Sequence, residues 1–439
     1  MTYKRFRTFI ILLAGCIVLA FVYLYQWDGC PVNPIRSDGW GYYSYLPAIF
    51  DYKDLSFSFS REAIDTASIW CDINGNTINK YPVGVAILQF PFFIVVDIFC
   101  KLFFPALATG YTAPYQAAVL CATTFYFLLG VFILYKVLWA HFSCKVTGWT
   151  LLSMLFGTSL FHYATYDASF SHVYSFFAVN AFVYVVRKCD INCGRISNNL
   201  LLGFLAGLIL VLRNPNVVVL LFYILYGAQT FTALKNRIIQ LVKPKRLLPN
   251  ILGCALPVCL QCLYWYHATG SLVIRSYNES ETFSWLTPHV VEVLFSVSKG
   301  LIFYSPLIGI AIGGIFVFRK TQKEFPLYGA AVVIFIHLYI TASWDCWQYG
   351  GSFGQRPFVD IYIFYALYLG TVYEYWDSLV LYNSEENEKR KPQTVLNLLL
   401  PIICVFLFMS LKFMLAYWHG ILPFADATMQ DIAHVWGKR

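Results

Sequence analysis

The stretch TFIILLAGCIVLAFVYLY, residues 8–25, is an unbroken apolar run without a charged residue. A helix of this length, at about 1.5 Å per residue, crosses the hydrocarbon core of a bilayer. Lys4, Arg5 and Arg7 precede the run, and their positive charge predicts that the N-terminus faces the cytoplasm. The run is too hydrophobic, and too poor in small-residue cleavage sites, for a removable signal peptide, so we expect an uncleaved anchor.

The composition extends this pattern to the whole chain. Of the 439 residues, 59% are hydrophobic and 12% are charged, and the mean hydropathy is +0.61. Soluble domains carry about 25% charged residues. Backbone polar groups in lipid must be satisfied within their own segment, which requires helices, and the alternating pattern of a membrane barrel is absent. We therefore predict an all-α, polytopic helical membrane protein with a single integral membrane domain, residues 1–439.

Further apolar runs predict about eleven spans in all, with boundaries uncertain by a few residues. Residues 84–107 are also apolar, but Pro91, Asp97 and Lys101 interrupt them. Counting this segment as a crossing would place several basic connectors outside, so we expect an amphipathic helix in the membrane interface. The predicted spans are residues 8–25, 115–137, 148–165, 172–187, 199–213, 216–233, 248–267, 300–318, 325–342, 357–374 and 395–417.

This topology leaves two long segments outside the spans. Residues 26–114 form a first external loop that contains the interfacial helix, and residues 375–394 form a cytoplasmic loop. The net charge of +8 comes from basic residues in short cytoplasmic connectors, so it sets membrane orientation and does not form a nucleic-acid surface. We expect a multi-pass protein of the cytoplasmic (inner) membrane that binds no nucleic acid.

The unusual polar residues gather on the predicted external, or periplasmic, side. The first group is SDGWGYYSYLP, residues 37–47, directly behind the first span. The predicted cytoplasmic side offers only basic connectors. We predict one site at the membrane surface, because a carboxylate, several cations and the glycine-rich loop of residues 350–354 lie on the same side. The other external groups are Asn79–Pro82, Tyr166–Asp167, Ser171–His172, Arg213–Asn214, Lys299–Leu301, Tyr304–Pro306 and Trp344–Pro357.

Three short motifs carry a resemblance to a known superfamily. They are DGWGYY at residues 38–43, KYPVG at 80–84 and WQYGGSFGQR at 347–356. Together with the span number and the long first loop, they resemble uncharacterised bacterial members of the GT-C superfamily of membrane glycosyltransferases. The KYP element before the interfacial helix is similar to that of aminoarabinose and protein-O-mannosyl-type transferases. Many members carry Asp-Glu where this sequence has Asp38–Gly39.

The resemblance implies a polyprenyl-phosphate-linked sugar donor and transfer at the outer face of the membrane. Such chemistry needs a carboxylate that aligns and deprotonates the acceptor hydroxyl, and we assign this catalytic role to Asp38; the alternative is that Asp38 caps a juxtamembrane helix. Negative charge grows on the departing phosphate, and cations stabilise it. Lys80 and Arg356 are the first candidates to bind the donor phosphate, followed by Arg213 and Lys299. The alternative for Lys80 and Arg356 is that they snorkel to the interface.

Aromatic and polar residues around the expected cleft are candidates to bind the sugar. Aromatic faces stack on sugar rings, but tyrosine and tryptophan are also enriched at any membrane interface. Trp344 and Trp347 stand beside the glycine-rich loop, and they are the main stacking candidates. The full set of predicted substrate-binding residues is Tyr42, Tyr43, Tyr81, Asp167, His172, Trp344, Trp347, Gly351 and Ser352.

No cofactor is firmly predicted. A divalent metal bound by Asp38, Asp167 and His172 is one alternative, since carboxylates and imidazole suit several divalent ions. In the other alternative, His172 caps a helix.

We predict a glycosyltransferase that moves a hexosyl or pentosyl group to a lipid, glycan or protein acceptor. A transporter or flippase of a lipid-linked sugar, a surface-polysaccharide ligase or polymerase, and a non-catalytic scaffold are the alternatives, and the sugar, acceptor and stereochemical outcome stay open.

Overall fold

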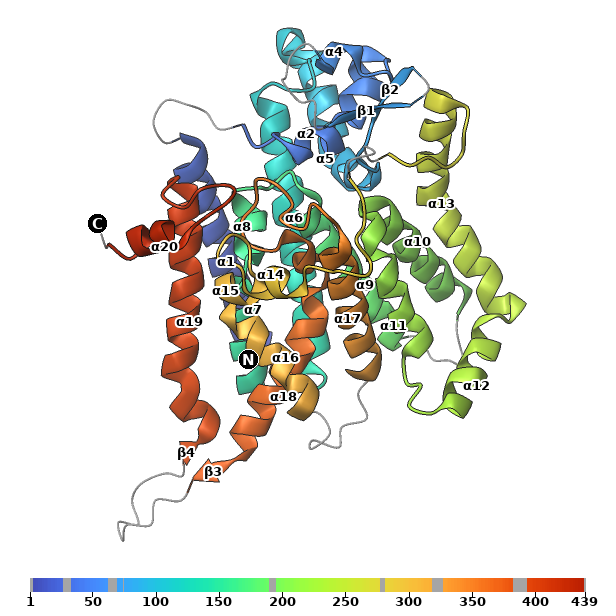
Figure 1. Ribbon diagram of the computed structural model, residues 1–439. Coiled ribbons are helices and arrows are strands. Elements are labelled where there is room, and N and C mark those ends of the chain that lie inside the picture. Colours follow the sequence, from blue (N-terminus) through green and yellow to red (C-terminus); the bar gives the residue numbers. More distant parts are fainter. Residues whose placement is uncertain are drawn as a thin grey trace.

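The computed structural model describes residues 3–26, 33–61, 69–73, 75–188, 195–276, 281–317, 327–381 and 393–437. These residues form a bundle of helices with two small antiparallel sheets (Figure 1). One sheet pairs β1 (Trp70–Ile73) with β2 (Asn76–Asn79) at one end of the bundle, called here the hairpin end. The other pairs β3 (Val380–Leu381) with β4 (Gln393–Thr394) at the opposite end.

Long apolar helices form much of the bundle. Among the described residues, five helices are long and apolar enough to cross a membrane by length and composition. They are α1 (Tyr3–Gln26), α5 (Gly84–Phe103), α6 (Ala113–Trp139), α13 (Pro244–Thr269) and α19 (Val395–Trp418). Shorter helices lie between them: α9 (Ser171–Lys188), α10 (Ile196–Leu212), α16 (Pro306–Val317) and α17 (Leu327–Ser343). The prediction of an all-α, multi-pass membrane protein is confirmed.

Helix α18 (Tyr362–Ser378) lies deep in the bundle, and its residues from Tyr362 to Tyr373 are all buried. Tyrosine is tolerated there because its hydroxyl finds a hydrogen-bond partner. Tyr362 lies 3.0 Å from Ser159 and Tyr373 lies 2.9 Å from Ser153, hydroxyl to hydroxyl. Neighbouring helices therefore hold α18 through specific polar contacts as well as through apolar packing.

Within the described residues, each predicted span except 216–233 coincides with one helix or with two consecutive helical segments. Residues 148–165 are divided into α7 (Cys144–Phe156) and α8 (Leu160–Thr165). Residues 300–318 are divided into α15 (Leu301–Tyr304) and α16, which begins at Pro306. Residues 357–374 begin with the 3-10 helix η6 (Arg356–Ile361), which contains Pro357. Proline supplies no backbone N–H, and its fixed φ suits the first turn of a helix, so Pro306 and Pro357 each lie in the first turn of a new helical segment.

Two predicted boundaries were wrong. The predicted span 216–233 covers most of η4 (Asn214–Val219) and α11 (Leu220–Leu225), but the chain then turns at Gly227, whose φ is 73°, and starts α12 (Phe231–Leu241). The predicted cytoplasmic loop 375–394 starts too early, because α18 continues to Ser378 and β3 follows it. The centre of that loop, residues 382–392, lies outside the described residues.

The predicted first external loop contains several short elements at the hairpin end. They are α2 (Asp38–Tyr43), α3 (Tyr45–Pro47), η2 (Ala48–Tyr52), α4 (Ser58–Arg61), β1, β2 and η3 (Pro105–Leu107), with α5 before η3. Helix α5 packs beside the first half of α6, where the rings of Phe93 and Tyr115 are 5.4 Å apart. Since α5 is also long enough to cross a membrane, its interfacial placement stays a prediction.

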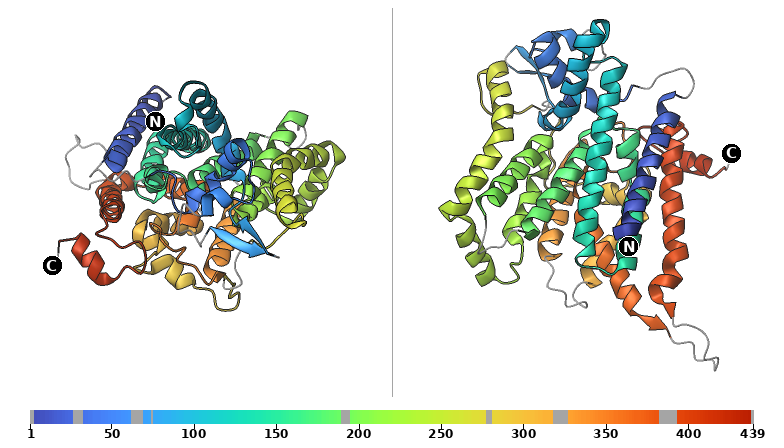
Figure 2. Two further views of the ribbon diagram at one scale, coloured as in Figure 1. Left: turned by 90° about the horizontal axis from the view of Figure 1, so that it is seen from above. Right: turned by 180° about the vertical axis from the view of Figure 1, so that it is seen from behind.

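Helices from distant parts of the sequence meet at the bundle's edges. α1 and α19 run side by side in both side views (Figures 1 and 2), and the Tyr23 hydroxyl lies 2.6 Å from His419 Nε2. On another side of the bundle α10 packs along α13. Their backbones are in close contact at Gly203 of α10, where an added Cβ would lie 2.0 Å from the carbonyl oxygen of Asn250 in α13. Two short helices complete the order, α14 (Val290–Phe295) and α20 (Met429–Val435).

Candidate active site

The Asp38 carboxylate lies at the hairpin end, at the first residue of α2, and contacts side chains from two distant segments. Its Oδ2 is 2.6 Å from Nη1 of Arg356, and its Oδ1 accepts a hydrogen bond of 2.8 Å from the Tyr81 hydroxyl. Ser37 occupies the N-cap position and makes no side-chain capping bond. Both Asp38 oxygens are therefore engaged by groups outside α2, which differs from the alternative that Asp38 serves as a helix cap.

Tyr81 is the second partner of Asp38, and the hairpin places it there. Asn79, the last residue of β2, donates from Nδ2 to the Gly41 carbonyl at 2.7 Å and accepts from the Tyr81 backbone N–H at 3.0 Å. Burial, followed by the charge of Asp38, raises the pKa of Tyr81 well above its ordinary value. The phenol therefore stays protonated and acts as a hydrogen-bond donor to an ionised carboxylate.

The glycines of the DGWGYY motif allow this close packing. A Cβ on Gly39 would lie 1.8 Å from the Ser169 Oγ, and a Cβ on Gly41 would lie 2.3 Å from the ring of Tyr81. Ser169 is itself fixed by a hydrogen bond of 2.8 Å from its hydroxyl to the Pro34 carbonyl. A side chain at residue 39, such as the Glu found in many GT-C sequences, would displace α2 or the segment around Ser169.

A second carboxylate, Asp360 of η6, lies completely buried among polar groups from three other segments. Its Oδ2 is 3.1 Å from Arg213 Nη1 and accepts a hydrogen bond of 2.8 Å from Asn216. Its Oδ1 is 2.9 Å from His172 Nδ1. Asp360 thus fixes Arg213 at the end of α10 and gives His172 a partner. The sequence analysis missed Asp360, although an acidic residue near the start of a predicted apolar span is a candidate functional position.

Tyr349 lies between the two arginines. The guanidinium carbons of Arg213 and Arg356 are each 5.7 Å from the centre of its ring, which is within cation–π range. Tyr349 itself has a φ of 57°, which is unusual for a residue other than glycine, and Gly350 follows with a φ of 60°. The turn at the start of the glycine-rich loop thus presents one aromatic face that both cations approach. The sequence analysis missed Tyr349.

Lys299 lies beneath the glycine-rich loop and is almost completely buried. Its ammonium donates to the carbonyl of Ser352 and, at 2.6 Å, to the carbonyl of Phe424. Burial, and then the positive charge of Arg356, lower the pKa of Lys299 to about 7. In this position Lys299 joins the glycine-rich loop to the C-terminal segment, and its positive charge interacts with that of Arg356.

Lys80 forms an ion pair with Glu281. Its Nζ lies 3.4 Å from Glu281 Oε1 and 5.7 Å from the centre of the Tyr81 ring. Both members of this ion pair are largely shielded, with side-chain exposures of 10% for Lys80 and 16% for Glu281. The pair joins the segment after the hairpin to the segment before α14.

Asp167 is also buried, and it forms a separate cluster. Its Oδ1 is 3.1 Å from Arg36 Nη2, and its Oδ2 is 2.9 Å from Nε2 of His162. Trp418 donates to Nδ1 of His162 at 2.9 Å, so Nε2 carries the ring proton and donates it to Asp167. Burial would raise the pKa of Asp167, but the His162 hydrogen bond and Arg36 lower it to about 2.

The three residues considered for a metal site therefore have different partners. Asp38 pairs with Arg356, Asp167 with Arg36 and His162, and His172 with Asp360. Among the described parts of the chain, no group of three or more His, Cys, Asp or Glu side chains is arranged to hold a metal ion.

The other predicted substrate-binding residues occupy two regions. Tyr42 packs against Tyr81 with a ring separation of 4.7 Å, and Tyr43 is buried with its hydroxyl bonded to the Gly110 carbonyl. Trp344 packs on Tyr349 at 4.5 Å, and Trp347 is largely buried. In the glycine-rich loop Gly351 is exposed, whereas Ser352 is buried beside Lys299.

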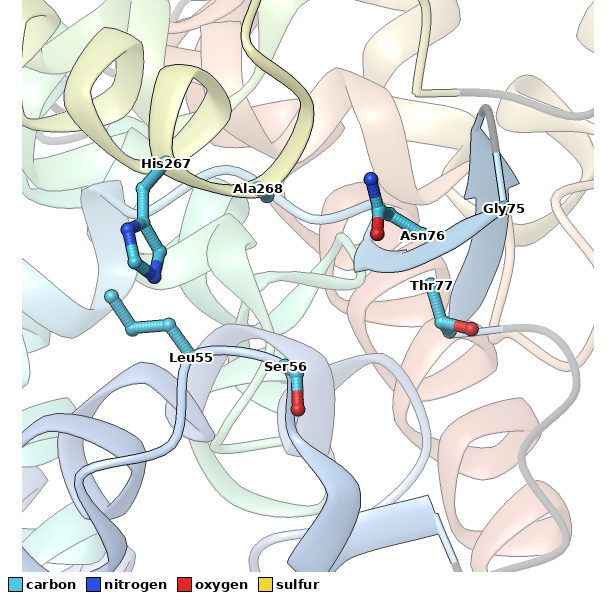
Figure 3. Close-up of a pocket in the computed structure, with 7 residues that line it drawn as sticks. All are labelled: Leu55, Ser56, Gly75, Asn76, Thr77, His267 and Ala268. Carbon is cyan, nitrogen blue, oxygen red and sulfur yellow. The ribbon is translucent and has the colours of Figure 1, made fainter.

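A separate pocket of about 250 Å³ lies outside this cluster. It opens between the β1–β2 turn, the loop before α4 and the end of α13, where the His267 ring faces Leu55 (Figure 3). None of the predicted site residues lines it. The polar cluster around Asp38 is thus the candidate active site, and this pocket is a distinct feature of the same end.

No protein-family model and no curated protein matches this sequence. Three solved structures resemble it in fold. The apo oligosaccharyltransferase of Archaeoglobus fulgidus is 11% identical, with a TM-score of 0.54, over 95% of this chain and 56% of that chain. AglB of the same organism, solved with an inhibitory peptide and a dolichol-phosphate, is 11% identical, with a TM-score of 0.51. The match covers 97% of this chain and 57% of AglB. ArnT of Cupriavidus metallidurans, solved with undecaprenyl phosphate, is 14% identical, with a TM-score of 0.47, over 95% and 78%.

The likeness to the two archaeal structures shows a shared fold. The chain spans little more than half the length of the archaeal oligosaccharyltransferases that it matches, 56% and 57%. The shared fold agrees with the architecture that the motif resemblance implied.

Proposed function

We propose that this protein is a glycosyltransferase that takes a sugar from a polyprenyl-phosphate-linked donor at the surface of the membrane. The observation that carries the proposal is the contact of Asp38 with Arg356, beside Arg213. A carboxylate and two guanidinium groups are the groups that a transfer from a lipid phosphate needs. The fold supports the same activity, since the archaeal structures that share it are oligosaccharyltransferases.

In the proposed reaction the acceptor hydroxyl attacks the anomeric carbon of the sugar. The hydroxyl proton moves to Asp38, the bond between the anomeric carbon and the phosphate oxygen breaks, and the lipid phosphate leaves with the bonding electrons. Tyr81 holds Asp38 through Oδ1. Because the phenol is a fixed donor, it keeps the carboxylate oriented while the other oxygen meets the acceptor.

The two arginines are proposed to bind the donor phosphate. Arg356 carries several N–H donors, so it can contact a phosphate oxygen while it still faces Asp38. Arg213 approaches the same Tyr349 ring, and its buried partner Asp360 fixes its position. The phosphate gains negative charge as the sugar leaves, so two preorganised cations lower the barrier. Lys80 and Lys299 remain proposed contributors through their charge, since both ammonium groups bond to protein oxygens.

The donor and acceptor follow as part of the proposal. The AglB structure contains a dolichol-phosphate and a peptide, and we expect a polyprenyl phosphate sugar as donor here and a lipid, glycan or protein hydroxyl as acceptor. A transporter of lipid-linked sugars is not favoured by this fold. Trp344 and the exposed Gly351 border the cations, and they are proposed to contact the sugar.

The proposed location is the external face of the cytoplasmic membrane, with the N-terminus in the cytoplasm. The distribution of basic residues supports this orientation. The basic segment from Lys235 to Arg246 lies on α12 and at the start of α13, at the end of the bundle opposite Asp38 (Figure 1).

Binding of undecaprenyl phosphate tests the proposal without knowledge of the sugar. Purified protein in detergent is titrated with undecaprenyl phosphate, and the complex is measured by native mass spectrometry. Arg356→Gln should weaken binding strongly, whereas Arg275→Gln, an exposed arginine before α14 that bonds to the Glu281 carbonyl, should not. Transfer is then assayed with a panel of undecaprenyl-phosphate-linked sugars. Equal binding by both variants and the wild type would contradict the proposed phosphate site.

A further inference from the structure

Helix α12 lies at the end of the bundle opposite the candidate active site (Figure 1), and it exposes an apolar stripe. Phe231 is 84% exposed, Ile238 is 44% exposed and Val242, which ends the helix, is 54% exposed. Spacings of seven and four residues place all three on one face of a helix. In water such a stripe would be unfavourable, so its position points to an apolar environment.

The opposite side of α12 is fixed to the bundle by one buried arginine. Arg237 donates from Nε and Nη2 to the Tyr223 carbonyl at 2.8 and 2.6 Å. Its guanidinium group also packs on the rings of Tyr223 and Tyr226, 5.3 and 5.5 Å from their centres. This anchor keeps α12 against the end of α11 while the apolar stripe remains outside the core.

The exposed charges around α12 are all positive. Lys235, Lys243 and Lys245 are exposed, and none of them forms an ion pair within the described ranges of the chain. The sequence from residue 195 to 276 contains no Asp and no Glu. An apolar stripe bordered by unneutralised lysines is complementary to a lipid surface with negative headgroups.

We propose that α12 lies in the membrane interface and that Lys235, Lys243 and Lys245 bind the headgroups of anionic phospholipids. The stripe of Phe231, Ile238 and Val242 would enter the acyl-chain region, and each lysine would meet a headgroup phosphate. Basic connectors that only set membrane orientation need charge alone. The exposed, anchored apolar face is the additional feature that indicates lipid binding.

Short-chain phosphatidylglycerol and phosphatidylcholine are titrated separately into the detergent-solubilised full chain, and bound lipid is counted by native mass spectrometry. The wild type should prefer phosphatidylglycerol. The triple variant K235Q/K243Q/K245Q should lose roughly 100-fold in affinity for it, at about five-fold per lysine. The control K389Q/R390Q/K391Q removes the same charge from a stretch that also contains Glu385, Glu386 and Glu388, and it should bind as the wild type does.

Two further measurements test whether the acyl chains are required and whether the variants fold equally well. Glycerol phosphate carries the charge without acyl chains and should not compete with the lipid at equal concentration. Thermal unfolding without added lipid should be the same for both triple variants, since Lys235 of α12 and Lys243 and Lys245 at the start of α13 are all exposed. Equal binding of the two lipids by the wild type, unchanged binding by the α12 variant, an equal loss in the control, or full competition by glycerol phosphate would each overturn the proposal. None of these results depends on glycosyl transfer.

Discussion

The Oδ2 of Asp38 lies 2.6 Å from Nη1 of Arg356, so the first segment after α1 meets the glycine-rich loop that precedes α18. The contact holds the Asp38 carboxylate and the Arg356 guanidinium group in one place. The same contact limits the positive charge that Arg356 offers to an anion. Loss of Asp38 should therefore lower turnover but strengthen phosphate binding, whereas loss of Arg356 should weaken phosphate binding.

Asp38→Asn should abolish most of the transfer and tighten the binding of undecaprenyl phosphate. Loss of a general base lowers turnover by about 10²–10⁴-fold, while removal of the neighbouring negative charge leaves Arg356 free to bind phosphate about 10-fold better. Turnover and binding are measured on the same preparation. Glu292→Gln, an exposed acidic residue of α14, is the control. Parallel loss of turnover and binding in Asp38→Asn would contradict this division of roles.

Arg356→Gln should weaken the binding of undecaprenyl phosphate by about 10- to 100-fold, the range for loss of a hydrogen bond to a charged group. Arg356→Lys should recover part of the loss, because the charge returns without the planar, forked donor geometry. A Lys variant that binds no better than the Gln variant would show that charge is not the important property at this position.

Asp360→Asn should lower the midpoint of thermal unfolding, because it leaves Arg213 with no buried counter-charge. Loss of one member of a buried ion pair costs about 3–5 kcal/mol. The double variant Asp360→Asn with Arg213→Gln removes both charges, so its loss should be smaller than the sum of the two single losses. Strict additivity would mean that Asp360 and Arg213 do not interact across their 3.1 Å separation.

Stability should rise with pH above neutrality because of Lys299. Its pKa is lowered to about 7 in the folded protein, from an ordinary value of 10.5. Between these two values the unfolded chain binds more protons than the folded chain, so the free energy of unfolding increases as the pH rises. Lys299→Gln keeps two N–H donors for the carbonyls of Ser352 and Phe424 but does not titrate. Its thermal midpoint should rise less from pH 7 to 9 than that of the wild type; identical profiles would refute the assignment.

Gly39→Ala should reduce turnover by displacing Asp38. The added Cβ would lie 1.8 Å from the Ser169 Oγ, so α2 must shift away from Arg356 and Tyr81. Adding Ser169→Gly removes the obstructing side chain and should restore part of the turnover, although it also removes the hydrogen bond to Pro34. If Ser169→Gly restores turnover, the loss in Gly39→Ala is due to local crowding and not to general instability. If turnover is not restored, the close packing of Gly39 against Ser169 is not the cause of the loss.

Much of the fold could be predicted from local sequence. The apolar runs locate the helices, because a bilayer-length apolar segment has few alternatives to a helix. Breaks at Pro306 and Pro357 follow from proline chemistry. The turn at Gly227 was not predicted, since an isolated glycine in an apolar run does not by itself show that the chain adopts a positive φ there. The β1–β2 hairpin was not predicted, since its short strands are stabilised by contacts with α13 such as the Tyr264 hydroxyl bonded to the Asn79 N–H.

The site was predictable only in part, because partners far apart in sequence are chosen by tertiary packing. Asp38 and Arg356 stood out as polar residues in short motifs, and the structure brings them into contact. Local sequence does not show that Lys80 faces Glu281 or that Lys299 bonds to two carbonyls. Asp360 was not predicted as a site residue because it lies within an apolar span and in no recognised motif. A carboxylate in such a span is itself a signal for a functional position.

The most direct test is an experimental structure of this protein in a lipid nanodisc with undecaprenyl phosphate bound. The phosphate is predicted to lie within hydrogen-bond distance of Arg356 and Arg213, with the Asp38 carboxylate beside it and the isoprenoid chain leading into the bilayer. A phosphate bound elsewhere on the hairpin end, or at the end that carries α12, would contradict the proposed site.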